Sequence, residues 1–215
     1  MWQIMFKDKY VKYFDLPQNY DDATGGEFYV HEMQALRSDL SSLAGRAITD
    51  EGLKASIAIY NQNRKAVRDL YAYRAQKPWQ APTSEVYLVL RAGCVLPPED
   101  HTQLIRQYLV EADREKRPQR DNARVVLTGS FCEQPPLGLI KSIEMAGCYV
   151  VDDDFQLIQS WLLDDVPLEG DPLEELSKAF LHRSAATSSK YDEKKEDKGK
   201  FLLHQVKARG AEGVI

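Results

Sequence analysis

Residues 124–154, RVVLTGSFCEQPPLGLIKSIEMAGCYVVDDD, constrain the fold more than any other stretch of the chain. The apolar run at 125–127 is short and rich in β-branched residues, as in a strand buried on both faces. Pro135 and Pro136 suit the first turn of a helix, where the missing amide would have no partner, and Gly147 suits its left-handed end. A second apolar run follows at 148–151. This pattern predicts two parallel strands joined by a helix.

The loop after the first strand and the aspartates after the second are expected at one edge of the sheet. Ligands of open parallel sheets bind beyond the carboxyl ends of the strands, and here those ends lead into residues 128–134 and into Asp152, Asp153 and Asp154. Like charges that are buried together raise one another's pKa. We therefore expect the aspartates to be exposed, where they either bind a cation or a hydroxyl group or simply solvate the end of the strand.

The first half of the chain is expected to be mainly helical. Apolar residues three and four positions apart predict helices over residues 29–44 and 53–76 and after Pro97, with Thr49 as the N-cap of the second. Residues 115–122 form a charged linker. We predict an α/β protein with a mainly helical lobe or connector at 1–118 and a three-layer, Rossmann-like parallel-sheet domain at 119–215, truncated at its C-terminus.

The remaining segments give shorter expectations. Residues 1–14 are rich in aromatic side chains and fit a strand, whereas residues 86–90 fit either a strand or the start of a helix. Short helices are expected over residues 171–180 and 201–207. A further strand begins at Val214, where the chain stops, and the first residues of the chain, 1–6, are already apolar. We therefore expect an internal piece of a longer polypeptide.

Composition and charge exclude several classes of function. The formal net charge of −5 argues against a nucleic-acid partner or an anionic membrane surface, because an acidic protein is repelled by both. No apolar run approaches the ~20 residues that cross a bilayer, and the start has no secretory pattern. These features favour a cytoplasmic location. Three cysteines are too few for a disulfide framework.

Motifs for nucleotide binding and for histidine chemistry are absent from the sequence. The loop that starts at Thr128 has one glycine instead of the three of a dinucleotide site, and G-x-x-x-x-G-K-[ST] does not occur, so this chain does not hydrolyse ATP through a P-loop. The histidines show no ligand spacing, and we expect each on the surface. They are His31, His101, His182 and His204.

A metal centre needs several soft ligands close together, and the three cysteines lack that spacing. Cys132 is the best-placed candidate ligand, because its loop lies at the carboxyl edge of the sheet and near a helix N-terminus that would lower the pKa of the thiol. Cys94 precedes a helix and is a weaker candidate. Cys148 opens a buried strand, where a thiol is usually a small hydrophobic residue.

Basic residues gather in the second half of the long helix at 53–76. Cations there suit the negative end of the helix dipole, and such runs are usually a solvated face. The alternative, which stays open, is contact with a phosphate-bearing ligand. The residues are Arg64, Lys65, Arg68 and Arg74.

Several motifs occur in an order and spacing that resemble one family. They are ITDE at 48–51, IYNQNR at 59–64, LPPEDH at 96–101, LTGS at 127–130, IExAG at 143–147, VVDDD at 150–154 and DPL at 171–173. From about residue 10 to residue 215, the chain resembles the benzoyl-CoA reductase / 2-hydroxyacyl-CoA dehydratase family. GSFCE at 129–133 is most similar to the C (gamma) subunits of its ATP-dependent reductases.

The resemblance implies a subunit of Rossmann-like domains that pairs with a homologous B subunit. Two further subunits would hydrolyse ATP with Mg and deliver electrons from ferredoxin. The implied reaction is two-electron reduction of the aromatic ring of benzoyl-CoA to a cyclic diene, in anaerobic degradation of aromatic compounds. The resemblance also implies a 4Fe-4S cluster in the complete subunit. Its main cysteine ligands would lie outside residues 1–215, so we expect this segment alone to bind no cluster and to be inactive.

Two other functions stay open. A 2-hydroxyacyl-CoA dehydratase subunit would share the fold and use the same cluster chemistry to eliminate water. A Rossmann-like lobe that only binds a partner would need no catalytic residues. The sequence does not identify the side chains that contact an acyl-CoA, so it does not choose between reduction and dehydration.

Overall fold

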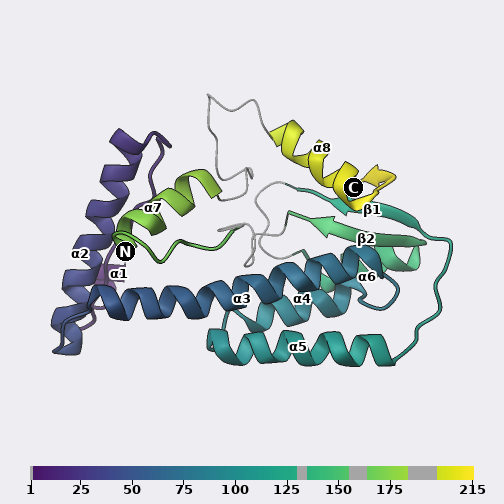
Figure 1. Cartoon of the computed structure of the whole chain (residues 1–215), viewed down its shortest axis with the longest axis horizontal. Coiled ribbons are helices and arrows are strands. Elements are labelled where there is room, and N and C mark those ends of the chain that lie inside the picture. The colour runs from purple at the N-terminus through teal and green to yellow at the C-terminus, as the bar shows by residue number, and fades with distance from the viewer. Residues whose placement is uncertain (1, 130–134, 155–163, 184–197) are drawn as a thin grey trace.

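A small parallel sheet lies at one end of a mainly helical molecule (Figure 1), as seen in a computed structural model that describes residues 2–129, 135–154, 164–183 and 198–215. The strands are β1 (Ala123–Leu127), β2 (Cys148–Asp153) and β3 (Gly213–Val214), in the order β2-β1-β3. Both neighbours of β1 run parallel to it. This arrangement confirms the predicted α/β class with a helical lobe.

The predicted β-loop-α-β unit is confirmed. Val125 pairs with Val150, and α6 (Leu137–Met145) connects the two strands. Pro136 stands immediately before the helix, and Gly147 follows it with φ of 91°, a conformation that glycine adopts without the steric cost of a Cβ. The register shifts after Val125, so that Val126 pairs with Asp152. With this bulge, Asp152 and Asp153 are both part of the strand, opposite Val126 and Leu127.

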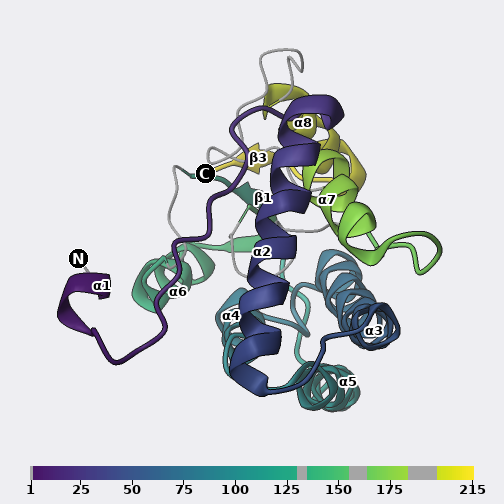
Figure 2. The same ribbon diagram turned by 90° about the vertical axis from the view of Figure 1, so that its left-hand side faces the viewer.

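Helices cover both faces of the sheet. Side chains of Val125 and Val150 pack with Tyr87 of α4 (Thr83–Ala92) and Ile140 of α6. The preceding residue, Arg124, points to the opposite face, as alternation along a strand requires. There its Nη2 donates to the carbonyl of Ala75 in α3 (Asp50–Gln76) at 2.6 Å and to that of Arg209 in α8 (Lys198–Arg209) at 2.8 Å. Figure 2 shows α6 and α8 on opposite sides of the strands.

A second core joins three helices near the sheet. Leu70 of α3, Leu90 of α4 and Ile105 of α5 (Pro98–Arg114) are buried together. Residues 86–90 are therefore helical, which resolves the ambiguity left by their short apolar run. Thr49 caps α3 as predicted, since its Oγ1 accepts a hydrogen bond from the Gly52 amide at 3.1 Å. From this cap, α3 runs the length of the molecule to the sheet (Figure 1).

The other end of the molecule consists of α2 (Glu27–Ala44), the short π-helix η1 (Asp22–Gly26) and α7 (Pro172–Arg183). Phe180 of α7 lies against Tyr29 of α2, with ring centroids 5.1 Å apart, and Ser177 Oγ donates to the Gly26 carbonyl at 3.3 Å. A helix from the second half of the chain thus packs on elements of the first half. The division at residues 118 and 119 stays a prediction.

The expected strand over residues 1–14 is wrong. Trp2–Met5 form the short helix α1, and the following residues run beside α2 without regular structure (Figure 2). Tyr10 Oη and Lys12 Nζ reach Asp39 Oδ2 of α2 at 2.7 and 2.9 Å. Side-chain contacts to one helix, rather than pairing with a strand, fix this segment. Within the described ranges, no helix has the length and apolar character needed to span a membrane.

Candidate functional site

Asp154, which follows β2, forms hydrogen bonds with the end of β1 at the carboxyl edge of the sheet. Its Oδ2 accepts hydrogen bonds from Thr128 Oγ1 at 2.8 Å and from the Gly129 amide at 3.2 Å. Its own amide donates to the Leu127 carbonyl at 3.2 Å. The predicted convergence of the loop after β1 with the aspartate run is confirmed at these residues.

The candidate ligand Cys132 lies outside the described residues. Cys94 is exposed after α4, and Cys148 is half-buried at the first position of β2, away from the carboxyl edge. Both are free thiols. Cys148 packs against the apolar cluster around Val125, in agreement with its expected role as a small hydrophobic residue.

The expectation that the aspartates are exposed is wrong for two of the three. Asp152 and Asp153 are 3% and 6% exposed, because helical arginines cover them. Arg74 Nη2 of α3 lies 2.7 Å from Asp153 Oδ2, and Arg209 Nε of α8 donates to Asp152 Oδ2 at 2.8 Å. Tyr71 Oη also donates to Asp153, at 2.9 Å. We call these five residues the β2 ion cluster.

Burial and pairing set the protonation of this cluster. Burial raises the pKa of Asp153 above its ordinary value, and the opposing effect of Arg74 is smaller. Burial by itself lowers the pKa of Arg74, but Asp153 and Tyr71 outweigh it, so the pKa of Arg74 is raised. Burial is also the main reason that the pKa of Tyr71 lies well above its usual value. Arg74 therefore stays charged and Tyr71 stays a neutral donor.

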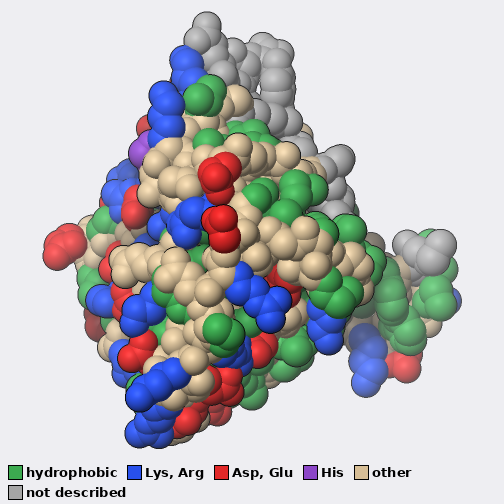
Figure 3. Space-filling model, turned by 90° about the vertical axis from the view of Figure 1, so that its right-hand side faces the viewer, with side chains coloured by type: hydrophobic (Ala, Val, Ile, Leu, Met, Phe, Trp, Pro, Cys, Tyr) green, Lys and Arg blue, Asp and Glu red, His purple; other side chains and the backbone are tan. Residues whose placement is uncertain are grey.

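The β2 ion cluster contains two positive and two negative side chains, so its formal charges cancel. The surface at this end of the molecule also shows Lys and Arg side chains interspersed with Asp and Glu (Figure 3). It connects α3 and α8 to the end of β2, and the guanidinium carbon of Arg74 also lies 4.5 Å from the centroid of the Tyr71 ring. A balanced, covered group of this kind fixes the packing of helices on the sheet. We interpret the β2 ion cluster as structural support for the carboxyl edge.

The basic stretch of α3 divides into different environments, so its description as one solvated face is wrong. Arg74 is completely buried, whereas Lys65 is exposed and pairs with Asp69. Arg64 and Arg68 are half-buried. Arg68 Nη2 donates to Asp165 Oδ1 at 2.7 Å.

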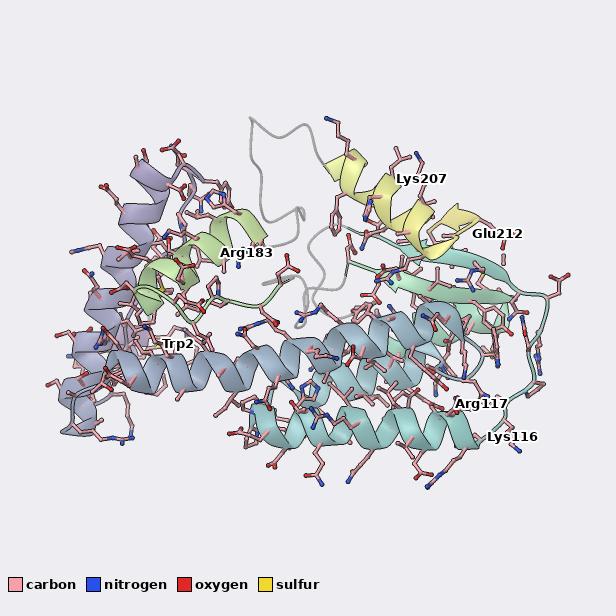
Figure 4. The ribbon with its side chains drawn as sticks, in the orientation of Figure 1. Trp2, Lys116, Arg117, Arg183, Lys207 and Glu212 are labelled. Carbon is pink, nitrogen blue, oxygen red and sulfur yellow. The ribbon has the colours of Figure 1, made fainter. Side chains whose placement is uncertain are left out.

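Arg183, at the end of α7, approaches the same aspartate as Arg68. Figure 4 shows Arg183 on the side of α7 nearer to α3. Its Nη1 donates to the backbone carbonyl of Asp165 at 3.0 Å. Arg64 lies close enough for the charges of Asp165 and Arg68 to affect its pKa. We call Arg64, Arg68 and Arg183 the arginine cluster. The sequence indicated two of its members, but nothing local pointed to Arg183, which comes from a distant helix.

The expectation that every histidine is on the surface is wrong for His101. It is 1% exposed in α5, with Nε2 3.0 Å from the Val89 carbonyl and Nδ1 2.9 Å from Asn63 Nδ2. These partners fit a neutral ring that carries its proton on Nε2. Burial lowers the pKa of His101, in spite of the opposing effect of the Val89 carbonyl. The ring therefore joins α3, α4 and α5 as a neutral packing residue.

The described residues do not fit an iron–sulfur cluster. Among them, no group of three or more His, Cys, Asp or Glu side chains is arranged to hold a metal ion. The two described thiols lie at the end of α4 and at the start of β2, not at the carboxyl edge of the sheet.

A pocket of about 330 Å³ lies between α2 and α7, far from the sheet. Its lining mixes three carboxylates, Asp22, Glu27 and Glu174, with His31 and Lys178. No motif in the sequence indicated it, because its residues come from two segments that are far apart in the chain, 22–34 and 174–178.

Residues 1–215 match the family described as "2-hydroxyglutaryl-CoA dehydratase, D-component" over their whole length. The chain belongs to this family.

Among curated relatives, the C subunit of benzoyl-CoA reductase from Thauera aromatica is 54% identical over 215 residues, covering 100% of this chain and 56% of the relative. The (R)-phenyllactyl-CoA dehydratase beta subunit of Clostridium sporogenes is 26% identical, covering 93% and 52%. The beta subunit of lactoyl-CoA dehydratase from Anaerotignum propionicum is 28% identical, covering 94% and 53%. The chain thus spans about half the length of the curated relatives it matches.

Proposed function

We propose that this chain is part of a benzoyl-CoA reductase subunit of the C type. The observation that supports the proposal best is its identity to the Thauera aromatica protein, which is much higher than its identity to the dehydratase subunits and extends over every residue. The reaction would be two-electron reduction of the aromatic ring of benzoyl-CoA to a cyclohexadiene-carbonyl-CoA. We place the enzyme in the cytoplasm.

The rest of the proposal follows the family resemblance. A homologous B subunit would complete the substrate-reducing module, and two further subunits would use ATP and Mg to deliver low-potential electrons from ferredoxin. The lack of a P-loop in this sequence agrees with ATP hydrolysis elsewhere in the complex. The complete subunit would hold a 4Fe-4S cluster, with Cys132 as a candidate ligand and the main ligands outside residues 1–215. We expect the 215 residues alone to be inactive.

Within this proposal, the described residues build and support the carboxyl edge of the sheet. Asp154 holds the first residues of the loop after β1, and the β2 ion cluster fixes the adjacent strand beneath α3 and α8. Ligands of parallel sheets bind at such an edge. We infer that this half of the subunit positions one wall of the acyl-CoA site.

A second candidate is a 2-hydroxyacyl-CoA dehydratase subunit, which the description of the family itself favours. The two candidates differ in chemistry, since one adds electrons to a ring and the other removes water from a hydroxyacyl group. A third, a lobe that only binds a partner, would give neither reaction.

The test is an anaerobic assay of the complete enzyme, assembled with its activating subunits, ATP and a low-potential donor. We expect ATP-dependent loss of benzoyl-CoA with formation of the diene thioester, and no dehydration of (R)-2-hydroxyacyl-CoA thioesters. Dehydration without ring reduction would assign the dehydratase function. Neither reaction in a complex with a full iron and sulfide content would assign the interaction lobe.

A further inference from the structure

We draw no further inference here: the strongest candidate, the pocket between α2 and α7, is lined by exposed carboxylates beside His31 and Lys178, and nothing in the described part of the chain points to a ligand that it would take.

Discussion

Arg68 and Arg74 lie on the same helix, and each approaches an aspartate from the second half of the chain to 2.7 Å. The side chains of Arg74 and Asp153 are 1% and 0% exposed, whereas those of Arg68 and Asp165 are 31% and 52% exposed. In the β2 ion cluster the formal charges balance, and solvent is excluded from the pair of Arg74 and Asp153. In the arginine cluster, solvent has access to both Arg68 and Asp165. Equal distances therefore accompany different environments, and burial decides how strongly each pair supports the fold.

The largest expected effect comes from removing Arg74. Arg74→Ala leaves Asp153 buried without its cation, which should lower the free energy of unfolding by about 3–5 kcal/mol. Arg68→Ala, the matched control, breaks a solvent-screened pair and should cost about 0–1 kcal/mol. Urea titrations of the two variants at pH 7 measure the difference. If both variants lost the same stability, burial would not distinguish the two clusters.

Replacing both partners of the buried pair tests whether the charges themselves stabilise the fold. The double variant Arg74→Met with Asp153→Leu leaves no uncompensated charge, so it should be more stable than Arg74→Ala by about 2–4 kcal/mol. Tyr71 keeps its place because its ring also packs in the core of α3, α4 and α5. The same titrations provide the measurement. A double variant as unstable as Arg74→Ala would show that the loss arises from packing and not from the isolated carboxylate.

The elements at the carboxyl edge could be predicted from the sequence, but the environment of their charged side chains could not. Both strands, α6 and Gly147 follow from patterns within residues 124–154. The burial of Asp153 depends on Tyr71, which is 82 positions away. That of Asp152 depends on Arg209, which is 57 positions away. No local sequence pattern indicates contacts between side chains so far apart in the chain, so the expectation of exposed aspartates was wrong.

The same limit applies to the arginine cluster and to His101. The sequence placed Arg64 and Arg68 in the second half of one helix, but the approach of Arg183 and Asp165 depends on the fold. The burial of His101 requires α3, α4 and α5 to meet, because Asn63 and Val89 supply its partners. Sequence periodicity identified α2, α3 and α5. It could not say which polar side chains of these helices face one another.

A third polar group packed against α3, His101 of α5, is buried without a formal charge, so its contribution to stability should depend on pH. His101→Leu removes the imidazole donor to the Val89 carbonyl and one of the partners of the Asn63 amide, which should cost about 1–3 kcal/mol at pH 7.5. Because the pKa of folded His101 lies below its ordinary value, the unfolded chain binds the proton more readily. Stability should therefore fall as the pH decreases from about 6.5 towards the folded pKa.

Unfolding titrations at pH 7.5 and 5.5 measure this slope. His101→Leu should lack the part of the pH dependence that His101 causes, so the gap between the variant and the wild type should narrow at pH 5.5. A gap that widened on acidification would mean that the folded ring binds the proton, contrary to its burial. Leu88→Ala, an exposed apolar change on α4, controls for small effects of substitution in this region.

The smallest effect should come from Asp154, the neighbour of Asp153 in the same run of aspartates. Its carboxylate accepts from Thr128 Oγ1 and the Gly129 amide at a partly exposed position, so Asp154→Ala should cost only about 1 kcal/mol. Asp154→Asn retains one oxygen as an acceptor and should recover part of that loss. If Asp154→Ala cost as much as Arg74→Ala, the strand ends would depend on this contact as strongly as on the buried pair. Exposure would then be a poor guide to the importance of a carboxylate at this edge.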